Sequence, residues 1–183
     1  MAYKNKKIHN PAFGQEILFL QTLKDTDGRL LEMQATYFAH SKRPAPHYHP
    51  YQEEYFEVLE GEMTVNAGDD HFILKKGDRL HIPTNQIHTM WNDTDQHTIL
   101  LWRVSPALQT EYLLETASGL SADGFISKSG NLPFLLSIFI GHRYSNVFRL
   151  ARPPYIIQRL VTSALYPLTL LYGYKSKLLK YID

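Results

Sequence analysis

Three histidines and one glutamate stand at spacings that could hold a metal ion. His47 and His49 are two residues apart, and side chains two apart on a strand point to the same face. A bend at Pro50-Tyr51 would let Glu54 return to that face, and His88 would arrive from a strand one hairpin away. Imidazole nitrogens with a carboxylate oxygen form a ligand set suited to Fe, Mn, Ni, Co, Cu or Zn.

Such a site would leave room for chemistry. Four protein ligands on an octahedral ion leave about two positions for substrate, water or dioxygen, and Glu54 could serve as ligand or as base. Glu53 alternates to the opposite face, so we assign it to solvent. Four other histidines lack a partner at matching spacing and are expected on the surface or beside the site: His40, His71, His81 and His97.

Short strands are the elements that would position these residues. Apolar or alternating runs cover 16–23, 31–38 and 97–104, and turn residues recur between them. The turns expected in the middle of the chain lie at Glu60-Gly61, Ala67-Gly68-Asp69-Asp70 and Lys76-Gly77-Asp78, where glycine would allow strands to pair. This pattern is typical of a β-sandwich or a small barrel.

Helical sequence begins only near residue 105. Ser105 as the cap, Pro106 at the first position and Gly119 at the end predict one helix laid across the barrel. Residues 120–133 are rich in Ser and Gly and predict a linker. Two helical segments follow, covering 132–151 and 153–182, with Pro153-Pro154 between them and Pro167 interrupting the second.

Length and composition indicate a globular protein. The chain has 183 residues, 44% of them hydrophobic and 20% charged, which predicts a barrel domain over 1–118 and a linker with a helical tail over 119–183. The absence of cysteine excludes disulfides and thiolate metal sites. It also fits a reducing compartment, and no apolar run follows the basic start, so we expect a cytoplasmic protein.

Charge divides the chain into an acidic body and a basic tail. Residues 1–130 carry 12 Lys and Arg against 17 Asp and Glu, a net of −5, whereas 131–183 carry seven against one, a net of +6. An acidic body without a preceding helix-turn-helix pattern argues against binding nucleic acid. Residues 160–174 contain no charged side chain but are shorter than the ~20 residues of a spanning helix. The tail therefore either contacts a membrane surface or packs on the barrel of its own chain or of a partner.

Two segments resemble the motifs of the cupin superfamily over roughly residues 35–104. The first reads His47-x-His49-x4-Glu54-x6-Gly61, and the second reads Gly77-x5-Pro83-x4-His88-x3-Asn92. The sequence departs from the family pattern at two positions where glycine is usual. Ser41 stands six positions before the first histidine, and Asn85 ends the Pro-x-Gly triplet. Neither departure touches a ligand position.

The resemblance implies an all-β fold, the double-stranded β-helix or jelly-roll barrel, here with a C-terminal α-helical extension. It implies one divalent metal ion per chain, held by His47, His49, Glu54 and His88. Fe, Mn or Ni is expected, and Zn is the alternative. Small cupins pair through barrel edges, so the resemblance also implies a homodimer.

Alternation predicts that Phe56, Met90 and Asn92 face the inside of the barrel as a substrate pocket. An apolar pocket without a basic cluster suits an apolar or aromatic small molecule better than a sugar phosphate. The favoured function is a metal-dependent oxidoreductase that resembles quercetin-dioxygenase-like small cupins, with Glu54 as a catalytic residue. Two alternatives stay open: an isomerase or lyase that uses the metal as a Lewis acid, and a non-catalytic small-molecule-binding or sensor barrel.

Overall fold

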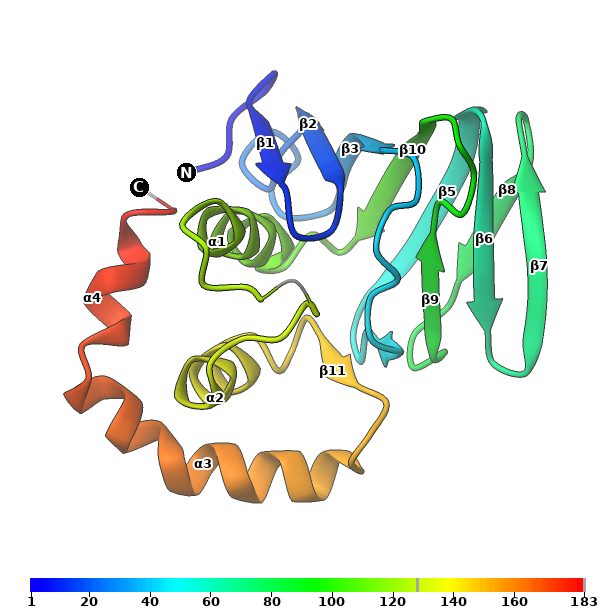
Figure 1. Ribbon diagram of the computed structural model, residues 1–183. Coiled ribbons are helices and arrows are strands. Elements are labelled where there is room, and N and C mark those ends of the chain that lie inside the picture. Colours follow the sequence, from blue (N-terminus) through cyan, green and yellow to red (C-terminus); the bar gives the residue numbers. More distant parts are fainter. Residues whose placement is uncertain (128, 183) are drawn as a thin grey trace.

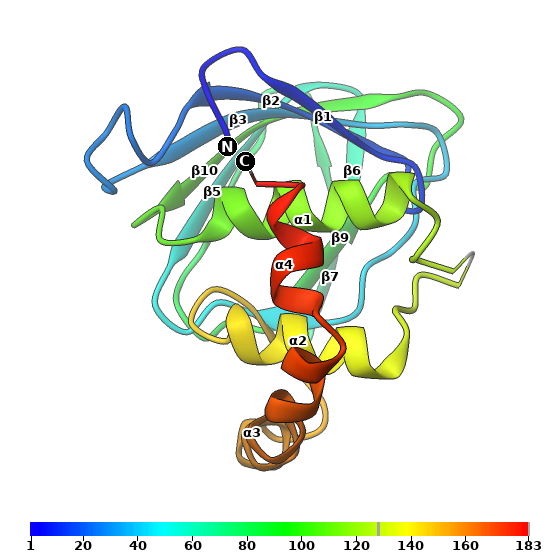
Figure 2. The same cartoon turned by 90° about the vertical axis from the view of Figure 1, so that its left-hand side faces the viewer.

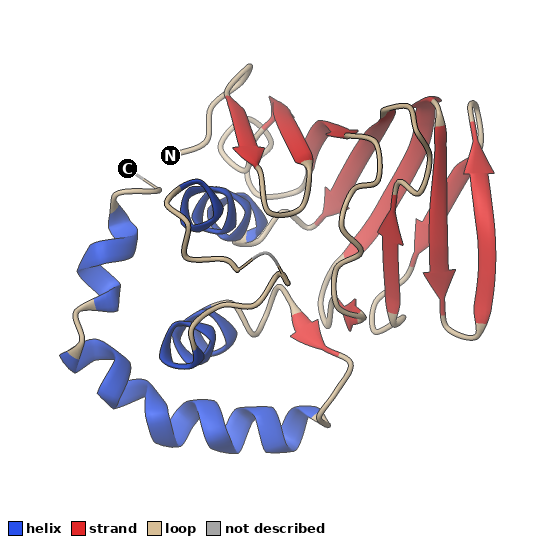
Figure 3. Cartoon of the chain, in the orientation of Figure 1, coloured by secondary structure: helices blue, strands red, loops and turns tan. Residues whose placement is uncertain are grey.

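Two antiparallel sheets form the body of the protein, and a group of helices covers one end of it (Figures 1 and 3). The structure is a computed structural model that describes residues 1–127 and 129–182. The predicted all-β double-stranded β-helix with a C-terminal helical extension is confirmed.

The larger sheet has six strands in the order β1-β2-β3-β10-β5-β8. Their bounds are β1 Lys7–Asn10, β2 Gln15–Gln21, β3 Leu31–Tyr37, β10 Thr98–Ser105, β5 Glu53–Glu60 and β8 Arg79–Ile82. The smaller sheet has five strands in the order β11-β4-β9-β6-β7. Their bounds are β11 Arg149–Leu150, β4 His47–Tyr48, β9 His88–Trp91, β6 Glu62–Ala67 and β7 Asp70–Lys75.

The turns at Gly61 and Gly77 carry the chain from one sheet to the other. The prediction that they pair neighbouring strands is wrong, because β5 pairs with β10 and β8, whereas β6 pairs with β7 and β9. Gly61 has a φ of +77°, and a Cβ there would lie 2.7 Å from the carbonyl oxygen of His97. The expected hairpin around Gly68 is confirmed, since it joins the paired strands β6 and β7.

The core fills the space between the two sheets. Alternate residues of β3 are buried, as half-buried strands require. Met63, Val65 and Leu74 of the smaller sheet are buried, and Phe72 packs partly buried against the same cluster. The inner faces of both sheets therefore build one continuous apolar core.

The helix after the barrel, α1 (Thr110–Ala122), starts and ends later than predicted. Ser105 is the last residue of β10 rather than a cap. Gly119 lies inside the helix, where a Cβ would collide with the ring of Tyr181. Glycine is needed here for close packing of the tail and not for ending the helix. The predicted boundary between 118 and 119 falls within α1, and the division into two parts stays a prediction.

The tail contains α2 (Phe134–Arg143), β11, α3 (Tyr155–Leu171) and α4 (Tyr174–Leu179). The helix predicted through 151 is wrong at its end, because β11 pairs there with β4 of the barrel. Pro167 does not interrupt α3. The carbonyl it leaves without a backbone donor belongs to exposed Ser163, where water can replace the lost bond.

The tail packs on the barrel of its own chain. Figure 2 shows α1 and α2 side by side in front of the strands, with α3 and α4 outside them. A second apolar cluster joins α1, α2 and α4 through Leu120, Leu136, Phe139 and Leu178. Within the described residues, every helix is too short or too polar to cross a membrane.

Candidate metal centre

The structure brings the three predicted histidines together. His47 on β4 lies directly opposite His88 on β9, and their ring centroids are 4.5 Å apart. The ring of His49 lies 5.3 Å from each of the other two. Each imidazole offers a nitrogen within 4.8 Å of the others. His49 and His88 are buried, and His47 is half-buried.

Each of these imidazoles is held at its Nδ1 atom by a backbone carbonyl oxygen. Because a carbonyl only accepts, each Nδ1 carries the proton and donates it. In the neutral form of each ring, the Nε2 atom then keeps a free lone pair, which is the tautomer that binds metals. The three donor–acceptor pairs are His47 with Ala45 at 2.9 Å, His49 with Val147 at 2.6 Å and His88 with Gln86 at 3.1 Å.

Glu54 approaches the histidines from the opposite sheet. The expected return to the same face after Pro50-Tyr51 is wrong, since β4 and β5 belong to different sheets. One carboxylate oxygen, Oε2, lies 3.2 Å from Nε2 of His49 and 2.9 Å from Nε2 of His88. The other, Oε1, accepts a hydrogen bond of 3.0 Å from Nε1 of Trp102. This bond fixes the orientation of a carboxylate that is only 2% exposed.

Burial and the charges of neighbouring side chains set the protonation states of His47, His49 and Glu54. Burial, helped by His88 and His49, lowers the pKa of His47 to about 3, so this imidazole is neutral at pH 7. Burial would raise the pKa of Glu54, but His49 and His88 outweigh it and hold that pKa well below its usual range. Burial would lower the pKa of His49, yet the facing Glu54 carboxylate raises it overall. A carboxylate and a neutral imidazole are both in the form that binds a cation.

Two atoms at the centre of the site are buried without a hydrogen-bond partner among residues 1–127 and 129–182. They are Nε2 of His49 and Oε2 of Glu54, which lie close together but are not aligned for a hydrogen bond. Unpaired buried polar atoms are rare and costly in folded proteins. A divalent cation between them would satisfy both, so the residues present fit a metal ion.

The tail supplies contacts that sequence reasoning missed. The ring of Phe148 stacks on His47 with centroids 4.6 Å apart, and the carbonyl of Val147 accepts the bond from His49. Val147 is buried, and the hydroxyl groups of Tyr144 and Thr116 lie 3.2 Å apart, which ties this segment to α1. The only signal in the sequence was the apolar character of 147–148, which also suits an ordinary helix.

The three predicted pocket residues lie in the core or hold a turn. Phe56 and Met90 are buried in the core, and Phe56 stacks on Trp102 at 5.7 Å. Asn92 is fully buried and holds a turn, so its amide is not free to face a ligand. Its Nδ2 donates to the carbonyls of Tyr37, Phe38 and Gln96, and its Oδ1 accepts from the backbone and hydroxyl of Thr94.

The residues assigned to the surface lie outside the site. Glu53 faces outward beside His81, with 3.0 Å between the carboxylate and Nε2. The other three of the four histidines assigned to the surface also have partners away from the centre. His40 contacts Asp95, His71 contacts Asn66, and His97 contacts Glu60.

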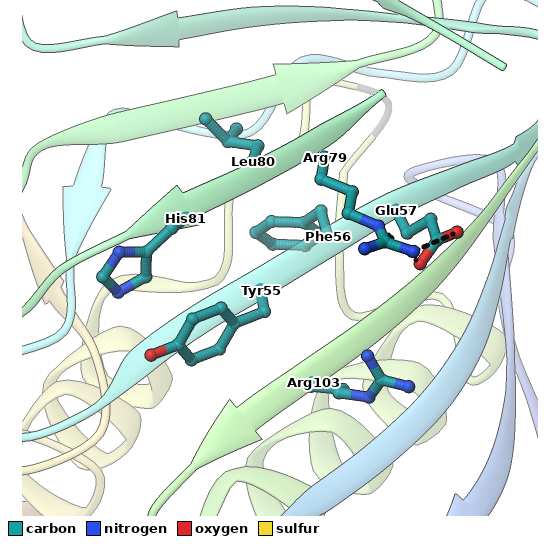
Figure 4. Close-up of a pocket in the computed structure, with 7 residues that line it drawn as sticks. All are labelled: Tyr55, Phe56, Glu57, Arg79, Leu80, His81 and Arg103. Carbon is teal, nitrogen blue, oxygen red and sulfur yellow. Dashed lines mark hydrogen bonds and ion pairs between the residues drawn. The ribbon is translucent and has the colours of Figure 1, made fainter. Parts of the chain in front are cut away.

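A separate depression of about 470 Å³ lies on the outer face of β10, β5 and β8 (Figure 4). Its charged groups are paired, since Arg79 lies 3.1 Å from Glu57 and Arg103 lies 2.7 Å from Glu32. None of the proposed metal ligands lines it. The lining residues are Tyr55, Phe56, Glu57, Arg79, Leu80, His81 and Arg103.

Comparison with known proteins finds a family model and relatives that match the barrel. The model of the cupin domain family matches residues 36–104. The polyketide synthase CurC of Streptomyces cyaneus is 34% identical over 65 residues, which is 36% of this chain and 42% of that protein. The quercetin 2,3-dioxygenase of Bacillus subtilis is 36% identical over 66 residues, 36% of this chain and 19% of that protein. The matched segment thus spans less than half the length of either relative.

Among solved structures, an RmlC-like cupin from Shewanella frigidimarina is similar to this chain. It shares 21% sequence identity and a TM-score of 0.49, over 57% of this chain and 86% of that chain.

Proposed function

Because residues 36–104 form a cupin domain, we propose that the protein binds one divalent metal ion and uses it to oxidise an apolar or aromatic small molecule. The proposed ligands are His47, His49, His88 and Glu54. The observation that carries the proposal is the approach of the Nε2 atoms of His49 and His88 to a buried oxygen of Glu54 that has no hydrogen-bond partner within the described chain.

The protein's own groups would prepare the site in two ways. Backbone carbonyls hold the histidines in the tautomer that binds metal. Trp102 fixes the Glu54 carboxylate, which is ionised and can take a proton from a substrate hydroxyl. A bound ion supplies Lewis acidity and, when it is Fe, Mn or Ni, redox chemistry.

The surroundings favour an apolar or aromatic substrate. Phe148 and Val147 touch the site from the tail, and Trp102 touches it from the barrel. Similarity to a quercetin 2,3-dioxygenase supports oxidation as the reaction class.

Oxygen uptake by the metal-loaded full chain with a panel of phenolic compounds tests this proposal. We expect uptake that falls at least about a hundredfold in Glu54→Gln and persists in His81→Ala, which alters an exposed histidine outside the site. Conversion of a compound without oxygen uptake would instead indicate an isomerase or lyase. Binding of a compound that is recovered unchanged would indicate a sensor barrel.

The resemblance to small cupins also leads us to propose a homodimer that pairs through barrel edges. Sedimentation velocity of the full chain tests it, with a dimer expected and a monomer at all concentrations contradicting it.

A further inference from the structure

One face of α3 is apolar and exposed along the whole helix. Its residues recur at helical spacing, so they form one continuous stripe. Leu160 is 65% exposed and Leu171 is 84% exposed, whereas α3 has only one buried residue, Thr169. We call this stripe the α3 face, and it consists of Ile156, Ile157, Leu160, Val161, Leu168 and Leu171.

The opposite side of α3 is the one that packs on the protein. Tyr166 stacks on Phe139 at 5.7 Å and on His142 at 4.0 Å, both on α2. In Figure 1, α2 lies between α3 and α1, so α3 is the outermost element on that side. The α3 face therefore points away from both apolar clusters of the protein, although its composition is that of a packing surface.

Cations without acidic partners lie within α3 and on the segments directly before and after it. Arg152, Arg159 and Lys175 are exposed, and none of them forms an ion pair with a described residue. The sequence contains no Asp or Glu from 124 to 182. Tyr172, at the end of α3, is 55% exposed. An apolar stripe with arginine and tyrosine beside it is the composition of helices that lie in a membrane interface.

We propose that the α3 face docks on the surface of an anionic phospholipid bilayer, with the helix lying in the plane of the interface. Charge complementarity selects this occupant. The headgroups would neutralise Arg152 and Arg159 while the apolar side chains enter the acyl boundary. Pairing with the α3 face of a second copy would bury the same apolar side chains but would bring these cations together without an acid to balance them.

Docking would hold the barrel at the bilayer. Only four residues separate β11 from α3, and β11 pairs with the strand that carries His47. The docked helix is thus connected to the barrel through the five-stranded sheet. This inference needs neither a bound metal nor a substrate and is independent of the proposed function.

Sedimentation of the full chain with vesicles tests the proposal. We expect binding to phosphatidylcholine vesicles that contain phosphatidylglycerol and at least about tenfold weaker binding to phosphatidylcholine alone. Leu160→Glu and Leu171→Glu should each weaken binding by at least about tenfold. Arg159→Gln should weaken it roughly fivefold. The matched control is Ile73→Glu, which places the same charge at a residue of β7 that is 51% exposed and should bind like the wild type.

Two results would overturn the proposal. One is equal or absent binding of the wild type to anionic and neutral vesicles. The other is a wild-type dimer that Leu160→Glu converts to monomers without any vesicle binding, which would make a second copy the occupant. Because all the replaced side chains are exposed, unchanged thermal unfolding is expected and will show that the variants are folded.

Discussion

The ring of Phe148, in the tail, lies on the imidazole of His47, in the barrel, with centroids 4.6 Å apart and planes inclined by 26°. The two residues are 101 positions apart in the sequence. The contact makes the tail part of the wall of the candidate metal centre. The tail therefore contributes a side chain to the candidate metal centre.

This contact leads to the first prediction. Phe148→Ala should lower the free energy of unfolding by about 1–3 kcal/mol, since Phe148 is half-buried, and should speed release of a bound metal to a chelator. Urea denaturation and chelator kinetics measure the two effects. Phe134→Ala is the control, because Phe134 is 64% exposed and its loss should change stability by less than about 0.5 kcal/mol. Equal metal release from both variants would contradict a role for Phe148.

A second prediction concerns the orientation of Glu54. Trp102→Phe removes the indole donor to Oε1 while keeping an aromatic ring against Phe56. We expect metal affinity to fall about 10–100-fold, as when other outer partners of metal ligands are removed. Metal titration measures this fall. Trp91→Phe should leave the affinity unchanged, because Trp91 contacts Arg43 and His71 outside the site.

The third prediction distinguishes the cost of a positive φ from the cost of a steric clash at an added Cβ. Gly61 and Gly68 both have positive φ, at +77° and +60°, but only a Cβ at Gly61 would meet neighbouring atoms. Gly61→Ala should therefore destabilise the protein by at least about 1 kcal/mol more than Gly68→Ala. Urea midpoints of the two variants give the comparison. Equal destabilisation of the two variants would contradict a steric clash at Gly61, because it would mean that the neighbouring backbone moves aside at no cost in stability.

Part of the ligand cluster could be predicted from the sequence, because two of its members are close together in the chain. His47 and His49 share one short segment, and strand alternation alone puts them on one side. The partner strand of His88 follows from the spacing of the second motif. The route of Glu54 could not be predicted, because the bend at Pro50-Tyr51 looks the same whether the chain stays in one sheet or passes to the other. Which route the chain takes depends on where the apolar faces find partners.

The role of the tail could not be predicted for a related reason. Val147 and Phe148 read as part of an apolar helix, and nothing local shows that they end beside His47. The same holds for Gly119, whose function depends on the ring of Tyr181 packing against it. Tertiary contacts of this kind override local propensity, and a single sequence does not display them.

Elemental analysis of the full chain, purified without a metal-affinity tag, tests the central claim most directly. The wild type should contain close to one Fe, Mn or Ni ion per chain. His49→Ala and His88→Ala should each lose the ion, whereas His81→Ala, which changes an exposed histidine, should keep it. A folded wild type that holds no ion, even after incubation with Fe²⁺, Mn²⁺, Ni²⁺ and Zn²⁺, would contradict a metal centre at these histidines.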